Sequence, residues 1–176
     1  MSKLYYCKVG TPIGDIKIAG TKRGICFVDL VQKSDDDFKL AMEKRFGVSP
    51  IKDEIELMDA VNEFMAYFAG ELKVFSVPLD ISVGTEFQKT VWTQLREISF
   101  GQVRSYKWLA ERIGKPKASR AVGNANGKNP IPIIIPCHRI IETNGGLGGF
   151  SSGIATKRKL LLHEGVAETG LGLLKR

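Results

Sequence analysis

The chain has 176 residues and a mass of 19.4 kDa, enough for one domain of ordinary size or two small ones. Hydrophobic residues make up 43% of it and charged residues 26%, a composition that excludes disordered, collagen-like and low-complexity proteins. The longest apolar run, residues 131–137, contains two prolines and is far shorter than the roughly 18 residues of a membrane span. Because the start also lacks an apolar leader, we expect no membrane contact and a protein of the cytoplasm, or of the nucleus in a eukaryote.

Basic residues concentrate in the second half of the chain. The formal charge is +7 in total, but residues 1–84 carry 11 basic and 13 acidic side chains, while residues 85–176 carry 15 and 6. Lysine and arginine neutralise phosphates and supply most of the sequence-independent affinity for nucleic acids. The second half is therefore predicted to face nucleic acid, the alternative being a basic surface that only keeps the protein soluble.

Three short strands are predicted near the start, separated by turn signals that include Gly10 and Pro12. The connections between them are short, so an antiparallel meander is expected. The predicted strands span residues 5–9, 14–19 and 25–30.

Two helices are predicted next. Ser34 offers an N-cap, and the aspartates after it an acidic first turn, to a helix that extends through Phe46 and stops at Gly47. A second helix is predicted over 54–68, followed by an extended piece at 77–83. Its apolar stripe is interpreted as core packing and consists of Leu57, Met58, Val61, Phe64, Met65 and Phe68.

The pattern changes at Gly84, where we place the boundary between a domain of residues 1–84 and a domain of residues 85–176. Thr85 and Gln88 form a predicted capping box at the start of a helix. The apolar face of that helix consists of Phe87, Val91, Leu95 and Ile98.

A helix at 105–113, a turn at Gly114 and a further helix at 117–125 have the order of a helix-turn-helix motif. Most side chains of the last helix are small, which lets its backbone approach another surface closely. A tight contact with another helix is one interpretation. Eight basic residues against one acidic residue between Gly101 and Arg139 favour DNA.

Three cysteines in an intracellular chain predict free thiols. Cys7 and Cys26 lie on predicted strands and are interpreted as buried core thiols. Cys137 follows an apolar segment with prolines and precedes His138 and Arg139, which offer a base and a positive charge that favour the reactive thiolate. The alternative is an inert core cysteine with incidental neighbours.

Two glycine-rich segments match no cofactor motif. Residues 123–129 have too few residues between their glycines for a P-loop, and residues 145–149 fit no dinucleotide fingerprint. The cysteines and histidines do not complete a zinc site. We therefore expect no cofactor and no metal, and interpret 145–149 as a loop over a pocket.

Three stretches of the second half occur together in one known family. Residues 119–123 read Ser-Arg-Ala-Val-Gly, residues 129–140 end in Pro-Cys-His-Arg-Ile, and residues 160–165 read Leu-Leu-Leu-His-Glu-Gly. From 85 to 165 the chain resembles the O6-alkylguanine-DNA alkyltransferases, or methylated-DNA–protein-cysteine methyltransferases; the first half agrees only in general layout. The resemblance implies an α+β protein with a ribonuclease-H-like N-terminal domain, built on a small antiparallel sheet with helices. The C-terminal domain would be mostly helical and winged-helix-like, with a helix-turn-helix.

The resemblance implies roles for five residues in alkyl transfer. Cys137 would attack the alkyl carbon on guanine O6 and keep it as a thioether, so that each molecule reacts once. His138 would act through a water as its base, with Glu164 orienting the imidazole. Asn129 would hold the turn that carries the thiol, and Tyr106 would hydrogen-bond or protonate guanine N3.

It also implies contacts with the flipped base and with DNA. The substrate-binding residues would be Ile140, Gly148, Phe150 and Ser151, although Phe150 stands where Tyr or Trp is common in relatives. Arg120 would fill the gap left by the flipped nucleotide while the small-residue helix lies in the minor groove. The neighbouring DNA-binding residues would be Lys117, Ser119, Ala121 and Gly123.

We therefore predict a monomeric DNA-repair protein that accepts alkyl groups from O6-alkylguanine, and also from O4-alkylthymine, in double-stranded DNA. Three alternatives are a sensor that binds lesions without reacting, a thiol hydrolase or acyltransferase, and a helix-turn-helix regulator. His163 is a second candidate for the base, although an imidazole just before Gly165 also complements a helix dipole.

Overall fold

The computed structural model describes residues 3–31 and 33–167. The chain forms two compact units, Met1–Ile81 and Ser82–Arg176, and the division lies close to Gly84. Helices and strands occur in both units, which confirms the predicted α+β class. No helix of the described residues is long and apolar enough to cross a membrane.

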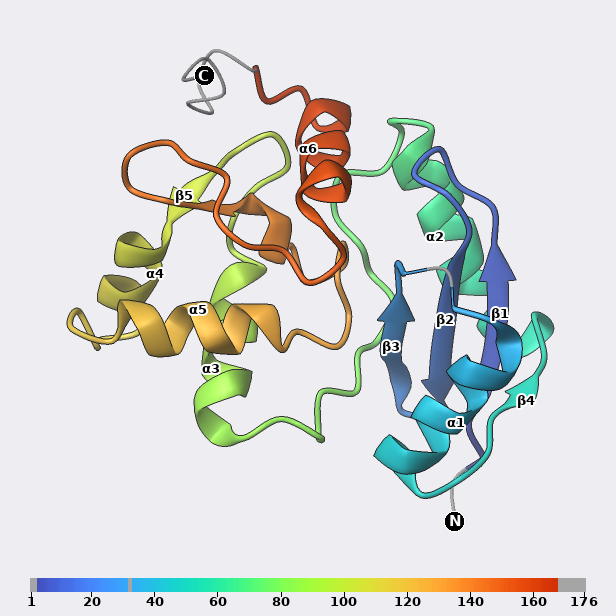
Figure 1. Ribbon diagram of the computed structural model, residues 1–176. Helices are drawn as coiled ribbons and strands as arrows, with labels where there is room; N and C mark the ends of the chain where they lie inside the picture. Colours follow the sequence, from blue (N-terminus) through green and yellow to red (C-terminus); the bar gives the residue numbers. More distant parts are fainter. Residues whose placement is uncertain (1–2, 32, 168–176) are drawn as a thin grey trace. The chain divides into compact units, whose positions relative to one another are not determined.

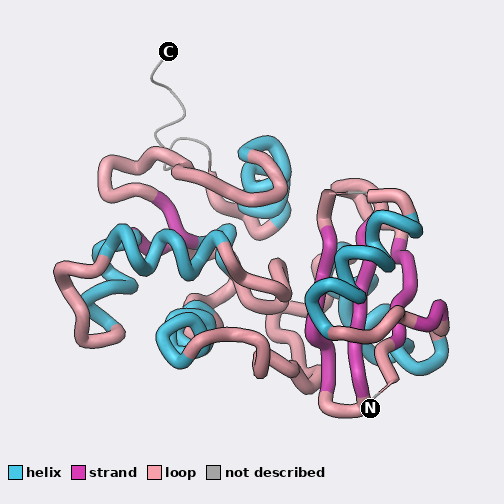
Figure 2. Tube along the Cα trace, turned by 60° about the horizontal axis from the view of Figure 1, so that its bottom comes forward, coloured by secondary structure: helices cyan, strands magenta, loops and turns pink. Residues whose placement is uncertain are grey.

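The N-terminal unit is built on a four-stranded sheet in the order β3-β2-β1-β4 (Figures 1 and 2). The strands β1 (Tyr5–Val9), β2 (Ile16–Thr21) and β3 (Gly24–Asp29) form the predicted antiparallel meander. A two-residue strand, β4 (Ile51–Lys52), pairs with β1 in parallel and has no counterpart in the sequence prediction.

The helices of this unit begin and end largely where local signals place them. In α1 (Asp35–Phe46), the Ser34 hydroxyl accepts a hydrogen bond from the main chain of Asp37, and Gly47 ends the helix with φ 73°. The second predicted helix is divided into a 3₁₀ turn, η1 (Ile55–Leu57), and α2 (Met58–Phe68).

Helical segments cover both faces of the sheet (Figure 1). Ala19 of β2 lies in a buried cluster with Phe38 and Met42 of α1. A Cβ added to the next residue, Gly20, would come within 2.9 Å of Leu57 in η1. Because successive strand residues point to opposite faces, α1 and η1 lie on opposite sides of the sheet.

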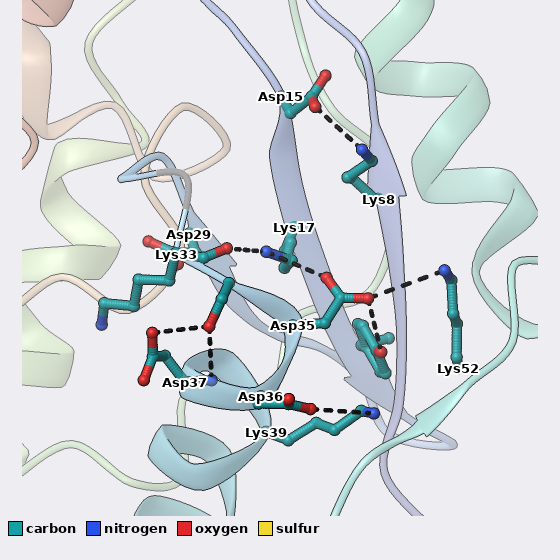
Figure 3. A network of polar contacts seen from close by, with 12 residues as sticks. Lys8, Asp15, Lys17, Asp29, Lys33, Asp35, Asp36, Asp37, Lys39 and Lys52 are labelled. Carbon is teal, nitrogen blue, oxygen red and sulfur yellow. Dashed lines mark hydrogen bonds and ion pairs between the residues drawn. The ribbon is translucent and has the colours of Figure 1, made fainter.

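A polar network ties the start of α1 to the sheet (Figure 3). Lys17 of β2 is only 5% exposed, and its Nζ lies 3.3 Å from Asp35 and donates to the main-chain oxygen of Lys33. Asp35 also accepts a hydrogen bond from the Tyr6 hydroxyl at 3.3 Å and lies 3.8 Å from Lys52. A buried ammonium requires such partners, so the network holds α1 against β1, β2 and β4.

Gly24 shows how closely β3 packs against the segment that follows α2. A Cβ at Gly24, where φ is 132°, would lie 2.3 Å from the main-chain oxygen of Pro78. Ile25 donates to that oxygen at 2.8 Å, so the two backbones cannot separate. We expect Gly24→Ala to lower the free energy of unfolding by about 2–4 kcal/mol, measured by urea denaturation.

Gly47→Ala is the matched control for this prediction. Gly47 has φ 73°, but a Cβ there would meet nothing within 4 Å. In this variant the free energy of unfolding should fall by only about 1 kcal/mol, which is the strain of an alanine in the left-handed conformation. Equal losses in both variants would contradict the assignment of the larger effect to crowding against Pro78.

The C-terminal unit contains the predicted helix-turn-helix. Its first helix, α3 (Glu86–Leu95), begins with the capping box predicted at Thr85. The helices α4 (Tyr106–Arg112) and α5 (Ser119–Gly127) follow and pack against each other. The Trp92 indole, buried in α3, donates to the main-chain oxygen of Ala125 at 2.8 Å and thereby ties α3 to α5.

Two further elements complete this unit. Two-residue strands, β5 (Arg104–Ser105) and β6 (Ile140–Ile141), pair in parallel. The last helix of the described residues, α6 (Ile154–His163), follows a glycine-rich loop. β6 directly follows the turn that carries Cys137, and α6 packs against that turn.

Candidate active site

The segment between α5 and the 3₁₀ turn η2 (Cys137–Arg139) folds back on itself. Asn129 holds both of its ends, because Nδ2 donates to the main-chain oxygen of Ile135 at 2.8 Å and Oδ1 accepts from the main chain of Ile131 at 3.0 Å. Ile133 between them has φ 77°, a left-handed conformation that β-branched residues rarely adopt. This constrained turn fixes the position of η2.

The thiol of Cys137 is nearly buried and lines a pocket of about 320 Å³. Burial raises the pKa of the thiol to about 11, although the Asn129 side chain and the Lys157 charge act to lower it. At neutral pH the thiol therefore needs a base to become a nucleophile. The pocket is lined by Tyr106, Gly123, Asn126, Gly127, Cys137, Gly149, Phe150 and Ser151.

His138 follows Cys137 in the chain and is fully buried, and its Nε2 lies 2.8 Å from Oε1 of Glu164. Burial acts to raise the pKa of Glu164, but hydrogen bonds from His138 and Arg139 hold that pKa well below its usual range. Because the ionised carboxylate only accepts hydrogen bonds, we assign the ring proton to Nε2, which leaves Nδ1 with a free lone pair.

The imidazole is suited to act as a base at neutral pH. Burial lowers the pKa of His138, which keeps the ring neutral. Its buried Nδ1 has no hydrogen-bond partner among residues 3–31 and 33–167. The other candidate, His163, is half-buried in the last turn of α6, with its ring edge-on to Phe100 at 6.2 Å. The geometry therefore favours His138 over His163.

Arg139 has a different environment from the one the sequence predicts. Its Nε and Nη2 donate to the two carboxylate oxygens of Glu164 at 2.8 and 2.9 Å, and Nη1 donates to the main-chain oxygen of Ile98 at 2.5 Å. The expectation that Arg139 supplies positive charge to the thiol is therefore corrected. Its charge is paired with Glu164, and the two together form a rigid support for His138.

Lys157 of α6 supplies the cation that acts on Cys137. The side chain is fully buried, and Nζ donates to the main-chain oxygens of Ile140, at 2.5 Å, and Leu147. Burial lowers the pKa of Lys157 to about 8, while the neighbouring Cys137 acts to raise it. No sequence motif points to this residue.

Tyr106 lies at the start of α4 with its ring between two glycines. A Cβ at Gly123 would approach the ring to 3.6 Å, and one at Gly148 to 3.2 Å. Burial raises the pKa of Tyr106, and the groups of Cys137 and Glu142 raise it further. The phenol is therefore protonated at neutral pH and can donate a hydrogen bond into the pocket.

The predicted site residues occupy three kinds of position. Five of them line the pocket: Tyr106, Gly123, Cys137, Phe150 and Ser151. Three others do not line it but hold η2 in place: His138, Glu164 and Asn129. Ile140 is fully buried and Gly148 adjoins the Tyr106 ring, and neither lines the pocket. Gly149 also lines the pocket and belongs to the glycine-rich loop that was expected to lie over one, whereas no sequence signal pointed to the lining residues Asn126 and Gly127.

The predicted DNA-binding residues lie on α5 and in the turn before it. Lys117, Arg120 and Ala121 are exposed, while Ser119 and Gly123 are half-buried. The small side chains leave the backbone of α5 accessible next to exposed cations. In the described part of the chain, no group of three or more His, Cys, Asp or Glu residues could hold a metal ion.

Replacing Lys157 with methionine is expected to reduce the reactivity of Cys137. Methionine preserves most of the buried volume but removes the charge that lowers the pKa of Cys137. The pKa of the thiol should therefore rise further, so that less thiolate is present at pH 7 and thiol alkylation by iodoacetamide becomes slower. The exposed neighbour Lys159 provides the control, since Lys159→Met should react at the wild-type rate; equal rates in all three proteins would contradict this role of Lys157.

Family models match both halves of the chain. One described as 6-O-methylguanine DNA methyltransferase, ribonuclease-like domain, matches residues 4–81. One described as 6-O-methylguanine DNA methyltransferase, DNA binding domain, matches residues 86–166. The matched residues include the sheet of the N-terminal unit and every residue of the pocket.

Individual proteins are similar over nearly the full length. A methylated-DNA–protein-cysteine methyltransferase of Methanosarcina acetivorans is 45% identical over 164 residues, which are 92% of this chain and 99% of that protein. The crystal structure of Mycobacterium tuberculosis O6-methylguanine methyltransferase matches with a TM-score of 0.81 and 39% identity, over 98% of this chain and 99% of that one. The structure of Mycobacterium tuberculosis OGT in complex with DNA matches with a TM-score of 0.77 and 39% identity, over 95% and 98%. The chain therefore belongs to the 6-O-methylguanine DNA methyltransferase family.

Proposed function

We propose that this protein repairs DNA by transferring an alkyl group from guanine O6 to the sulfur of Cys137. The observation that carries the proposal is a thiol that lines a pocket and is followed in the chain by a buried histidine, whose Nδ1 has no hydrogen-bond partner within residues 3–31 and 33–167. Relatives named as methylated-DNA–protein-cysteine methyltransferases, and one solved in complex with DNA, support DNA as the partner.

The chemistry is a direct displacement at the alkyl carbon. His138 Nδ1 takes the thiol proton, through a water, while Glu164 accepts the hydrogen bond from Nε2 and stabilises the imidazolium that forms. The sulfur attacks the alkyl carbon; a carbon–sulfur bond forms as the carbon–O6 bond breaks. Tyr106 donates a hydrogen bond to guanine N3, or a proton that the imidazolium then replaces. In the balanced reaction one proton is thus lost from the thiol and one is gained by the repaired guanine, which stays in the DNA.

The product determines the stoichiometry. A thioether lacks an easy leaving group, so the thiol is not regenerated and each molecule reacts once. The alkyl acceptor, its base and the orienting carboxylate all belong to one C-terminal unit. The reaction therefore requires no second subunit, and we propose that the protein acts as a monomer.

The helix α5 is the proposed contact with double-stranded DNA. Its small residues would enter the minor groove, Lys117 would contact phosphate, and Arg120 would occupy the space of the extruded nucleotide. The nucleotide has to leave the stack because the thiol is buried within the pocket. The same displacement is chemically possible on O4-alkylthymine, which we propose as a second substrate.

Intact-mass spectrometry tests the stoichiometry. The protein is mixed with an excess of duplex that contains O6-methylguanine, and unmodified duplex serves as the control. We expect every active molecule to gain one methyl group, and the amount of repaired DNA to equal the amount of protein. Repair of several duplexes per protein molecule, or an unmodified protein after repair, would contradict the proposal.

A further inference from the structure

The sequence contains two asparagines that are followed by glycine, and the structure places them in opposite environments. Such an asparagine readily loses its side-chain amide, because glycine has no Cβ to shield the peptide nitrogen that attacks it. Asn126 and Gly127 lie in the last turn of α5, and Asn126 is only 4% exposed. Asn144 and Gly145 lie in the glycine-rich loop after β6, and Asn144 is exposed. The helix holds the first pair in place, while water reaches the second.

The turn around Asn144 activates its side-chain carboxamide. The main-chain N–H of Gly146 donates to Asn144 Oδ1 at 2.9 Å. This contact polarises the side-chain carbonyl and stabilises the negative charge that Oδ1 carries once a nucleophile has added to the carbon. The nucleophile is the main-chain nitrogen of the next residue, Gly145. It donates to the main-chain oxygen of Glu142 at 3.0 Å, so this one hydrogen bond of the turn has to open before the attack.

We infer that Asn144 is a modification site, at which spontaneous deamidation gives aspartate and isoaspartate. The Gly145 nitrogen bonds to the side-chain carbonyl carbon of Asn144 as the bond from that carbon to Nδ2 breaks. Nδ2 leaves as ammonia with the proton that the Gly145 nitrogen loses, and a cyclic imide remains. Water then opens the imide at either of its two carbonyl carbons. The net reaction replaces the amide with a carboxylate and consumes one water for each ammonia released.

Both products change a loop that packs beside the pocket. A Cβ at Gly146 would lie 2.7 Å from Glu142 Oε2 and 3.1 Å from Asn144 Oδ1, so a new carboxylate at position 144 would lie close to an existing one. Isoaspartate also lengthens the main chain by a methylene, although a Cβ at Gly148 would already approach the Tyr106 ring to 3.2 Å. The added charge lies next to a pocket that α5 also lines. The modification itself is independent of the proposed function, whereas its effect on repair rests on that function.

Peptide mapping before and after incubation of the folded protein in mildly alkaline buffer tests the site. Trypsin separates peptide 140–157 from peptide 121–128, which contains Asn126. After incubation, peptide 140–157 should gain about 1 Da and separate into aspartate and isoaspartate forms, while peptide 121–128 should keep its mass. Asn144→Gln is the matched control, since glutamine would have to form a larger ring, and its peptide should stay unmodified. An unmodified peptide 140–157, or equal modification of both peptides, would overturn the inference.

Asn144→Asp tests the effect on repair, because it supplies the charge of one product without the longer main chain. Methyl transfer from O6-methylguanine duplex should be about threefold slower than in fresh wild type, since the added charge repels DNA phosphates. Asn62→Asp adds the same charge at an exposed position of α2, in the N-terminal unit, and should keep the wild-type rate. A wild-type rate in Asn144→Asp would overturn the effect on repair. If fresh wild type gains no methyl group, the proposed function itself fails.

Discussion

Replacing Cys137 with serine is expected to abolish methyl transfer while the protein still binds duplex DNA that contains O6-methylguanine. A hydroxyl fits the space of the thiol but is a far weaker nucleophile toward a saturated carbon, and the neighbouring imidazole cannot ionise it to a useful extent. The loss should exceed about a thousandfold, as is usual when the nucleophile of a catalytic unit is removed. Transfer of labelled methyl to protein measures the reaction, and electrophoretic mobility shift measures binding.

Cys7→Ala is the control for this experiment. Cys7 is buried in β1 of the N-terminal unit, and burial raises the pKa of its thiol to about 12. It should therefore remain an inert thiol, and its replacement should preserve the transfer rate of the folded protein. Transfer at the wild-type rate in Cys137→Ser would contradict the assignment of the nucleophile.

Glu164→Gln is expected to damage both reactivity and stability. The carboxylate accepts hydrogen bonds from His138, from Arg139 and from the main chain of Gly101 at 3.2 Å, and it is buried. A neutral amide leaves the buried guanidinium without its counter-charge, which should lower the free energy of unfolding by about 3 kcal/mol at pH 7. It also no longer fixes the imidazole tautomer or stabilises the imidazolium, so transfer should slow about a hundredfold.

The stability difference should depend on pH in one direction. The pKa of Glu164 is lowered in the folded protein, so the unfolded chain binds the proton first as the pH falls. The contribution of this carboxylate to the free energy of unfolding is fully present above its ordinary pKa of about 4.3. It is lost as the pH falls through the lower pKa of the folded protein. The difference in free energy of unfolding between the wild type and Glu164→Gln should therefore become smaller below about pH 4.

Denaturant unfolding at several pH values and single-turnover kinetics measure these effects. The control is Glu97→Gln, because Glu97 is an exposed carboxylate of the same unit. Its replacement should change stability by less than about 0.5 kcal/mol and leave the rate unchanged. A folded Glu164→Gln protein with the wild-type rate would show that orienting His138 is unimportant for the reaction.

The sequence predicts those elements whose signals are local. Ser34 and the box formed by Thr85 and Gln88 satisfy helix N-termini with side chains only three residues away, and both caps occur as predicted. Gly47 ends α1 because its left-handed conformation suits a glycine. The meander is predicted because each strand pairs with its neighbour along the chain.

Elements that depend on distant partners are not visible in the sequence. β4, β5 and β6 have two residues each and exist only through pairing with strands far away in the chain. Met65 fits the helical stripe by spacing, yet it is 52% exposed, since periodicity does not show how wide a face the neighbouring elements cover.

The residues of the site also fall into two groups: those predictable from a short stretch of sequence and those that depend on the fold. Cys137 and His138 are adjacent in the sequence, so the nucleophile and its base can be predicted from one short motif. Lys157 cannot be separated from the exposed Arg158 beside it without knowing which side of α6 is buried. The pairing of Arg139 with a carboxylate 25 residues away also depends on the fold, and so its effect on the thiol was predicted wrongly.

Peptide mapping after reaction with labelled O6-methylguanine duplex tests the central claim most directly. The protein contains three cysteines, and all of them are buried. Of the three, only Cys137 lines the pocket of Tyr106 and Phe150, and it directly precedes His138, whose ring is paired with Glu164. We predict that the label is recovered as S-methylcysteine at Cys137 alone, in an amount equal to the repaired base. Recovery of the label at Cys7, Cys26 or any other residue would contradict the account.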